Sequence, residues 1–146
     1  MELRTLISAL DTPQVVGVDQ LEIGQIVSDS RRVVPGSLFV AVRGVAVDGH
    51  QYIASAIEKG AVAIVCEEYP KELADKATFV VVKDSAYALG LLLSKSYGDP
   101  SQKLKLVGVT GTNGKTTIAT VLYELFRRLG YKVGLLSPVC NYIDGE

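Results

Sequence analysis

The chain of 146 residues is long enough for one large domain or two small ones. Apolar residues make up 48% of it and charged residues 21%, which is typical of a globular protein with an extensive core. The net charge of −1 excludes a nucleic-acid binder that relies on a broadly basic surface, so any phosphate group must be recognised locally. No apolar run reaches the roughly 18 residues of a membrane-spanning helix, so neither nucleic acid nor membrane is an expected partner.

The first 97 residues alternate helix-like and strand-like apolar patterns. Spacing of three and four residues predicts helices, and these lie at 3–10, from about His50 to Gly60, and at 86–97. Continuous apolar runs predict strands, and these lie at 23–27, 38–42, 61–66 and 78–82. Pro35-Gly36 predicts a type II turn. The alternation of strands and helices indicates an α/β unit.

The polar turn Gly98-Asp99-Pro100-Ser101 predicts a boundary between two domains, 1–98 and 99–146. The second part has a strand–helix–strand pattern, with a buried strand at 104–109, a helix at 118–129 and a strand at 132–136. One such βαβ unit buries only part of its sheet, because nucleotide-binding α/β domains need several more strands. We therefore expect the chain to be the N-terminal part of a longer protein.

A glycine-spaced turn joins the expected strand at 104–109 to the helix that follows. Its residues are Gly111, Thr112, Asn113, Gly114, Lys115, Thr116 and Thr117. The two glycines let backbone N–H groups converge on an anion, and the helix start adds partial positive charge. Lys115 would reach the β- and γ-phosphates of a nucleotide, and the Thr116 hydroxyl would ligate Mg²⁺. The generic loop has its first glycine at position 109, which is valine here, so a glycine-rich turn that binds nothing is the alternative.

Other polar residues have structural explanations by sequence alone. Ser28-Asp29-Ser30-Arg31 follows an expected strand and is at least as typical of a turn cap with a local ion pair. Asp48 is expected to cap the helix that begins near His50, and His50 is expected to be structural. Cys66 and Cys140 lack metal-ligand spacing and have strand-like neighbours, so two buried free thiols in a reducing cytoplasm are expected.

The loop at 111–117 resembles the ATP-binding loop of the Mur ligases, G-T-N-G-K-T/S, which has no glycine at the position of Val109. Folylpolyglutamate synthases share a similar loop but begin almost directly with the ATP domain. The first domain resembles that of the Mur ligases acting on UDP-MurNAc-dipeptide and UDP-MurNAc-tripeptide, in the segments Asp29-Ser30-Arg31, Pro35 to Ala41, Asp48-Gly49-His50 and Gly60-Ala61. Two further segments resemble the dipeptide-specific members most, namely Gly108-Val109-Thr110 and Val139-Cys140-Asn141-Tyr142.

The resemblance implies a small α/β UDP-binding domain followed by the first βαβ of a P-loop ATP-binding domain. It implies a bacterial cytoplasmic ligase of peptidoglycan synthesis that uses ATP and Mg²⁺. The substrates would be UDP-MurNAc-L-Ala-D-Glu and a diamino acid, meso-diaminopimelate or L-lysine, joined through an acyl phosphate. Lys115 would be catalytic, residues 111–117 would bind ATP, and Thr116 would hold the metal. The residues carried over as substrate-binding are Ser28, Ser30, Val45, Ala46 and Val47.

Two alternatives remain open at this point. One is the Mur ligase that adds D-Ala-D-Ala, and the other is a P-loop module that binds nucleotide without ligation. The second predicts an acidic metal-binding strand downstream and no affinity for a UDP-sugar. Pro138 departs from the family, which usually has a small hydroxyl residue there. The 146 residues alone are expected to be inactive, because the remaining ATP-domain strands and the amino-acid-binding domain would be missing.

Overall fold

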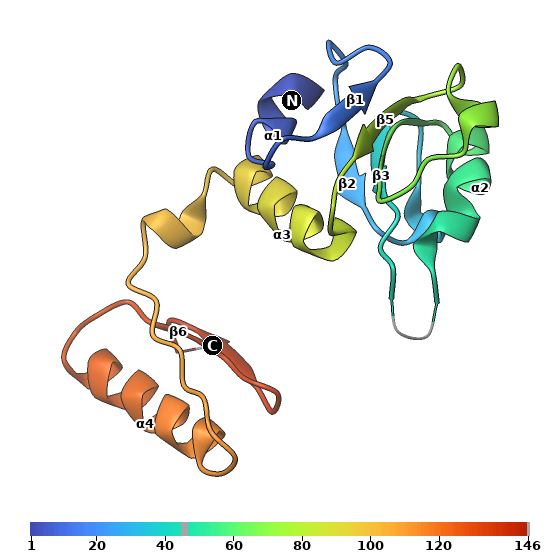
Figure 1. Cartoon of the computed structure of the whole chain (residues 1–146). Coiled ribbons are helices and arrows are strands. Elements are labelled where there is room, and N and C mark those ends of the chain that lie inside the picture. The colour runs from blue at the N-terminus through green and yellow to red at the C-terminus, as the bar shows by residue number, and fades with distance from the viewer. Residues whose placement is uncertain (45–46, 146) are drawn as a thin grey trace. The chain divides into compact units, whose positions relative to one another are not determined.

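The structure, a computed structural model, describes residues 1–44 and 47–145. The chain divides into two compact units, Met1–Leu104 and Lys105–Glu146 (Figure 1). The division lies close to the polar turn at 98–101, where the chain forms the short 3₁₀ helix η4, Pro100–Gln102. The roles expected for the two parts, binding of UDP-MurNAc and of ATP, remain predictions.

The first unit contains a five-stranded sheet with the strand order β1-β5-β4-β3-β2. Strands β2 to β5 are parallel, and β1 pairs antiparallel with β5 at one edge. The bounds are β1 Gln14–Val16, β2 Gln25–Val27, β3 Ser37–Val40, β4 Ala61–Cys66 and β5 Thr78–Val81. The predicted α/β class is confirmed, although β1 was not predicted. Because the parallel strands point the same way, the loops that follow β2, β3, β4 and β5 lie at one edge of the sheet.

Helices cover both faces of this sheet (Figure 1). The helices are α1 Leu3–Ile7, α2 Ile53–Glu58 and α3 Ser85–Ser96, with the 3₁₀ turns η1 Ser30–Arg32, η2 Gly49–Tyr52 and η3 Lys71–Leu73. Successive side chains of a strand point to opposite faces. Leu38 and Val40 therefore share an apolar cluster with α1 and α3, whereas Phe39 packs in a second cluster with α2. All three are fully buried.

Two glycines hold the beginnings of β3 and β4 together. Gly36 has a φ of 83°, and the N–H of Ser37 donates to the carbonyl of Val34 at 3.1 Å, which confirms the predicted type II turn. Gly60 has a φ of 97°, and a Cβ there would lie 2.8 Å from the Cα of Pro35. The Gly36 N–H donates to the Gly60 carbonyl at 2.9 Å. Both positions require glycine because of their positive φ, and Gly60 also because of its close approach to Pro35.

The described residues of the second unit form one helix and a hairpin, preceded by an irregular segment. Its elements are α4 Lys115–Arg128, β6 Gly134–Leu136 and β7 Asn141–Ile143, with β6 antiparallel to β7. The rings of Tyr123 and Tyr142 stack with their centroids 5.7 Å apart. Within the described part of this unit, Tyr123 and Leu135 are the buried hydrophobic side chains. Most of its other large apolar residues are exposed, among them Leu106, Val107, Ile118, Val121, Leu125, Leu129, Leu136, Val139 and Ile143.

The prediction of a buried strand at 104–109 is wrong. The segment has no strand pairing, and the side chains of Leu104, Leu106 and Val107 are all more than 60% exposed. The expected parallel pairing with 132–136 is also absent, and β6 pairs with β7. A hairpin forms through a local turn, whereas a buried parallel strand needs distant neighbours on both sides. The described residues supply none for this segment.

The two cysteines differ in their surroundings. Cys66 is fully buried at the end of β4, and burial raises the pKa of its thiol to about 12. Cys140 lies in the turn between β6 and β7 and is partly exposed, so the prediction of a buried thiol is wrong for this residue. A residue in a hairpin turn has no sheet face to cover it. None of the helices in 1–44 and 47–145 has the length and apolar character needed to cross a membrane.

Candidate functional site

The chain turns sharply after β2, where two of the predicted substrate residues lie. Ser28 is exposed, and Ser30 is partly exposed at the start of η1. Asp29 caps η1, since its carboxylate accepts from the Arg31 N–H at 2.9 Å. The Arg31 guanidinium also pairs with this carboxylate, at 2.7 Å between Nη2 and Oδ2. This side-chain hydrogen bond, followed by the backbone one, lowers the pKa of Asp29 to about 2. The structural explanation from sequence is thus confirmed for Asp29 and Arg31.

Basic side chains surround this turn although the whole chain is nearly neutral. The Lys59 ammonium donates to the Ser30 carbonyl at 2.9 Å. Arg31 and Arg32 are exposed on η1 itself, and Asp29 compensates one of the three charges. A local positive excess beside Ser30 would attract an anionic ligand such as a diphosphate.

An open cavity of about 610 Å³ lies along β2, which is an edge strand of the sheet. Ser28 and Asp29 line one part of it, and Leu89 and Leu93 of α3 line another, together with Tyr97 directly after this helix. Ser30 is not among the lining residues. The two predicted serines therefore lie two residues apart but face different surroundings.

The other predicted substrate residues follow β3. Val47 is 51% exposed, and its carbonyl accepts from the Gly44 N–H at 3.0 Å. Val45 and Ala46 lie outside the described residues. Because β2 and β3 are parallel neighbours, Ser28, Ser30 and Val47 belong to loops at the same edge of the sheet.

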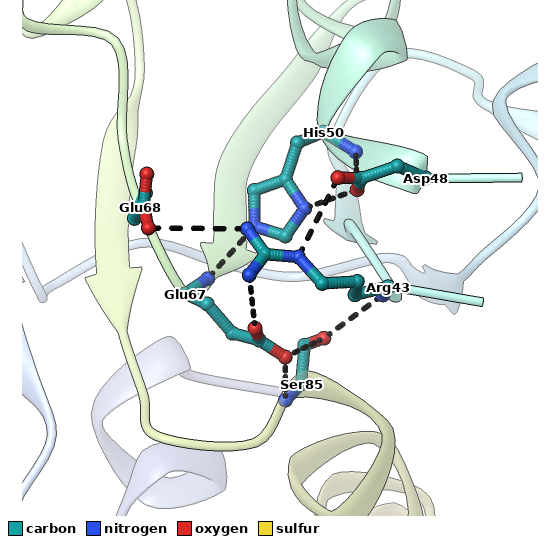
Figure 2. Close-up of polar contacts among 6 residues, drawn as sticks. All are labelled: Arg43, Asp48, His50, Glu67, Glu68 and Ser85. Atoms are coloured by element: carbon teal, nitrogen blue, oxygen red, sulfur yellow. Dashed lines mark hydrogen bonds and ion pairs between the residues drawn. The ribbon is translucent and has the colours of Figure 1, made fainter. Parts of the chain in front are cut away.

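A polar network that sequence reasoning missed lies at this same edge (Figure 2). It joins Arg43 after β3, Glu67 and Glu68 after β4, and Ser85 at the start of α3. His50 completes it and links Asp48 to the backbone of Glu67. Asp48 accepts from the His50 N–H at 2.9 Å, so the predicted cap is confirmed. The backbone and side-chain bonds from His50 lower the pKa of Asp48.

The glycine-spaced loop of the second unit curls as a phosphate-binding loop requires. Gly111 has a φ of 147° and Gly114 a φ of 75°, and α4 begins directly afterwards at Lys115. Among the described residues, no side chain caps this helix start. The first N–H groups of a helix have no acceptor within the helix, so those of Lys115, Thr116 and Thr117 are available to an anion.

Lys115 lies over its own loop rather than in the interior. Its exposed ammonium donates to the carbonyl of Gly111 and, at 3.3 Å, to that of Thr112. The Thr116 side chain is partly exposed, one residue beyond Lys115. Within the described residues no cluster of three or more His, Cys, Asp or Glu side chains could hold a metal ion. The donor set nevertheless fits a nucleotide phosphate, since it combines backbone N–H groups, one ammonium and one hydroxyl.

The sequence model of a protein family, described as "Mur ligase family, catalytic domain", matches residues 22–97, which is more than half of the chain. The chain belongs to the Mur ligase family. The matched residues run from the segment before β2 to the end of α3, and so include Ser28, Ser30 and the network of Figure 2.

Among Mur ligases, a protein of Parabacteroides distasonis is 72% identical over all 146 residues. It is named UDP-N-acetylmuramoyl-L-alanyl-D-glutamate–2,6-diaminopimelate ligase. The chain spans 30% of the length of that relative.

Solved Mur ligases have the same fold. MurF from Acinetobacter baumannii matches with a TM-score of 0.65 and 28% identity, over 88% of this chain and 28% of its own. The MurF ligase from Thermotoga maritima, in complex with ADP, matches with a TM-score of 0.51 and 34% identity, over 71% of this chain and 23% of its own.

Proposed function

We propose that the full-length protein containing this chain is an ATP-dependent ligase that adds diaminopimelate to UDP-MurNAc-L-Ala-D-Glu. The observation that carries the proposal is the 72% identity, over the whole chain, with a relative named for this reaction. Among the diamino acids that the sequence left open, the name of that relative favours diaminopimelate over L-lysine.

The second unit would bind the nucleotide. The loop Gly111–Thr117 would hold ATP through its backbone N–H groups, with Lys115 as the catalytic residue. The complex of a Thermotoga maritima relative with ADP supports a nucleotide as ligand. The Thr116 hydroxyl would hold Mg²⁺, which would neutralise part of the charge on the β- and γ-phosphates.

The first unit would bind UDP-MurNAc through the loops after β2 and β3. Ser28 and Ser30 would contact it from the first loop, and Val45, Ala46 and Val47 from the second. Support comes from the shared edge of the sheet and from the positive excess at Lys59, Arg31 and Arg32.

The chemistry has two steps. The γ-phosphoryl group of ATP passes to the free carboxylate of UDP-MurNAc-L-Ala-D-Glu, which leaves ADP and an acyl phosphate. The amine of the diamino acid then attacks the acyl carbon, phosphate departs, and the nitrogen loses a proton to give an amide. Lys115 would stabilise the negative charge on the transferring phosphoryl group, since its ammonium has three donors and two of them face the carbonyls of Gly111 and Thr112.

We predict that the full-length enzyme releases phosphate only when UDP-MurNAc-L-Ala-D-Glu and diaminopimelate are both present with ATP. A coupled phosphate assay measures this, with mass spectrometry of the nucleotide product. The control reaction contains UDP-MurNAc-tripeptide and D-Ala-D-Ala, the substrates of the MurF-type alternative. Turnover of the control pair instead would refute the proposal, and ATP binding without either ligation would favour the non-ligase module.

A second test concerns Ser30. Replacement of Ser30 by alanine is expected to weaken UDP binding about 5- to 10-fold, because one typical hydrogen bond contributes a net free energy of roughly 1–1.5 kcal/mol. The affinity is measured by NMR titration of UDP into the 146-residue chain, and exposed Ser101→Ala serves as the control. Chemical-shift changes confined to residues far from Ser30 would remove this serine from the proposed site.

A further inference from the structure

Arg43 faces three carboxylates from two places in the chain (Figure 2). Its Nε lies 3.5 Å from Asp48, its Nη1 lies 3.4 Å from Glu67, and its Nη2 lies 4.0 Å from Glu68. One positive charge among three negative ones makes the cluster unsuitable for binding an anion directly. Its contribution must therefore lie in what it holds in place.

Glu67 anchors this cluster to the sheet and to α3. Its carboxylate accepts from the Ser85 N–H at 3.1 Å and from the Ser85 hydroxyl at 2.9 Å. The Ser85 hydroxyl accepts in turn from the Arg43 N–H at 3.3 Å. Ser85 is fully buried and the Glu67 side chain is 19% exposed, so these bonds are largely shielded from water.

The same cluster fixes the chain on either side of Val47. Arg43 and Asp48 form an antiparallel bridge, and the Gly49 N–H donates to the Val42 carbonyl at 2.8 Å. A Cβ at Gly49 would lie 2.7 Å from that carbonyl oxygen, so the backbones approach as closely as glycine allows.

His50 provides a second tie to the end of β4. Its Nδ1 lies 2.6 Å from Asp48 Oδ1, and its Nε2 accepts from the backbone N–H of Glu67 at 2.9 Å. An acceptor at Nε2 requires a neutral ring with its proton on Nδ1. Asp48 is thus held to Glu67 twice, through the guanidinium of Arg43 and through the ring of His50 (Figure 2).

We propose that Glu67 and Arg43 are positioning residues for UDP-MurNAc, because they hold Val47 and Asp48 at the sheet edge that also carries Ser30. The inference rests on the proposed function. Neither residue needs to touch the substrate. Their effect is on the placement of Val47 and Asp48 for substrate binding, so it falls on substrate affinity and not on the chemical step.

The test compares Glu67→Gln with Glu68→Gln in the full-length enzyme. Glutamine at 67 keeps an oxygen that accepts from Ser85 but removes the charge that faces Arg43. The same change at position 68 removes an equal charge from a side chain that is 83% exposed and 4.0 Å from Arg43. For Glu67→Gln we expect KM for UDP-MurNAc-L-Ala-D-Glu to rise about fivefold, with kcat and KM for ATP unchanged. For Glu68→Gln we expect no change.

The outcomes separate the two proposals. An unchanged KM in Glu67→Gln, with or without a lower Tm, would mean a merely structural role and would overturn the inference alone. Equal increases in both variants would also overturn it, because the effect would then be one of general charge. If the wild-type enzyme does not consume UDP-MurNAc-L-Ala-D-Glu, the proposed function fails and the inference fails with it.

Discussion

Replacement of Lys115 by alanine in the full-length enzyme is expected to lower kcat about 100- to 1000-fold. A loss of this size is typical when an enzyme loses one preorganised hydrogen-bond donor that faces the charge developing in the transition state. Lys115 is exposed, and its ammonium contacts only the carbonyls of Gly111 and Thr112 among the described residues. Stability should therefore change little while phosphoryl transfer loses its cationic partner. Phosphate release in the steady state measures the effect.

The matched control is Lys132→Ala, which removes an exposed lysine of the same unit away from the loop. It should leave kcat within about twofold of the wild type, as is usual for a surface substitution outside a site. Circular dichroism of both variants checks that the fold is kept. Phosphate release by Lys115→Ala at the wild-type rate would overturn the assignment of residues 111–117 as the ATP-binding loop.

Replacement of Phe39 by alanine is expected to lower the free energy of unfolding of the first unit by about 3–5 kcal/mol, as buried Phe-to-Ala changes do. Phe39 is fully buried on β3, an interior strand of the sheet, where it pairs with Val27 of β2 and Ile64 of β4. The cavity left behind would lie between the sheet and α2, which is only six residues long. Urea unfolding followed by circular dichroism gives the measurement.

Tyr87→Ala is the control for this substitution, because the Tyr87 side chain is 63% exposed on α3. A change within about 0.5 kcal/mol is expected there. A similarly small change for Phe39→Ala would contradict the packing of α2 against the sheet. Phe39 pairs with Val27, which leads directly into Ser28. The Phe39→Ala variant should therefore also bind UDP more weakly, in proportion to the fraction of its molecules that are unfolded.

Local patterns predicted those elements whose contacts are local or whose faces are fully covered. The run 61–66 matches β4 residue for residue, and the spacing at 86–97 predicted α3 closely. The three-residue strand β1 was missed because its pairing with β5 lies more than 60 residues along the chain. For the segment 104–109 the error was the opposite one, because a strand was predicted where none forms. An apolar run alone does not provide the neighbouring strands that a buried strand needs.

The candidate site shows the same distinction. The loop at 111–117 could be predicted because all of its donors lie in one contiguous stretch. The network of Arg43, Glu67 and Ser85 could not, because it joins three separate segments of the chain. One signal was available: Glu67-Glu68 directly follows the apolar run of β4, at the edge where parallel sheets place functional side chains.

Strands β2 to β5 follow one another across the sheet in a single direction. Their connections therefore do not diverge to open a crevice of the kind that other parallel sheets offer to ligands. A nucleotide at these strand ends would contact the protein on one side, with much of its surface exposed to solvent. Binding sites normally enclose about 70–90% of the surface of a small ligand. Other parts of the full-length protein would cover the rest of the nucleotide. The affinity for UDP measured on this chain is therefore expected to be a lower limit for the affinity of the full-length protein.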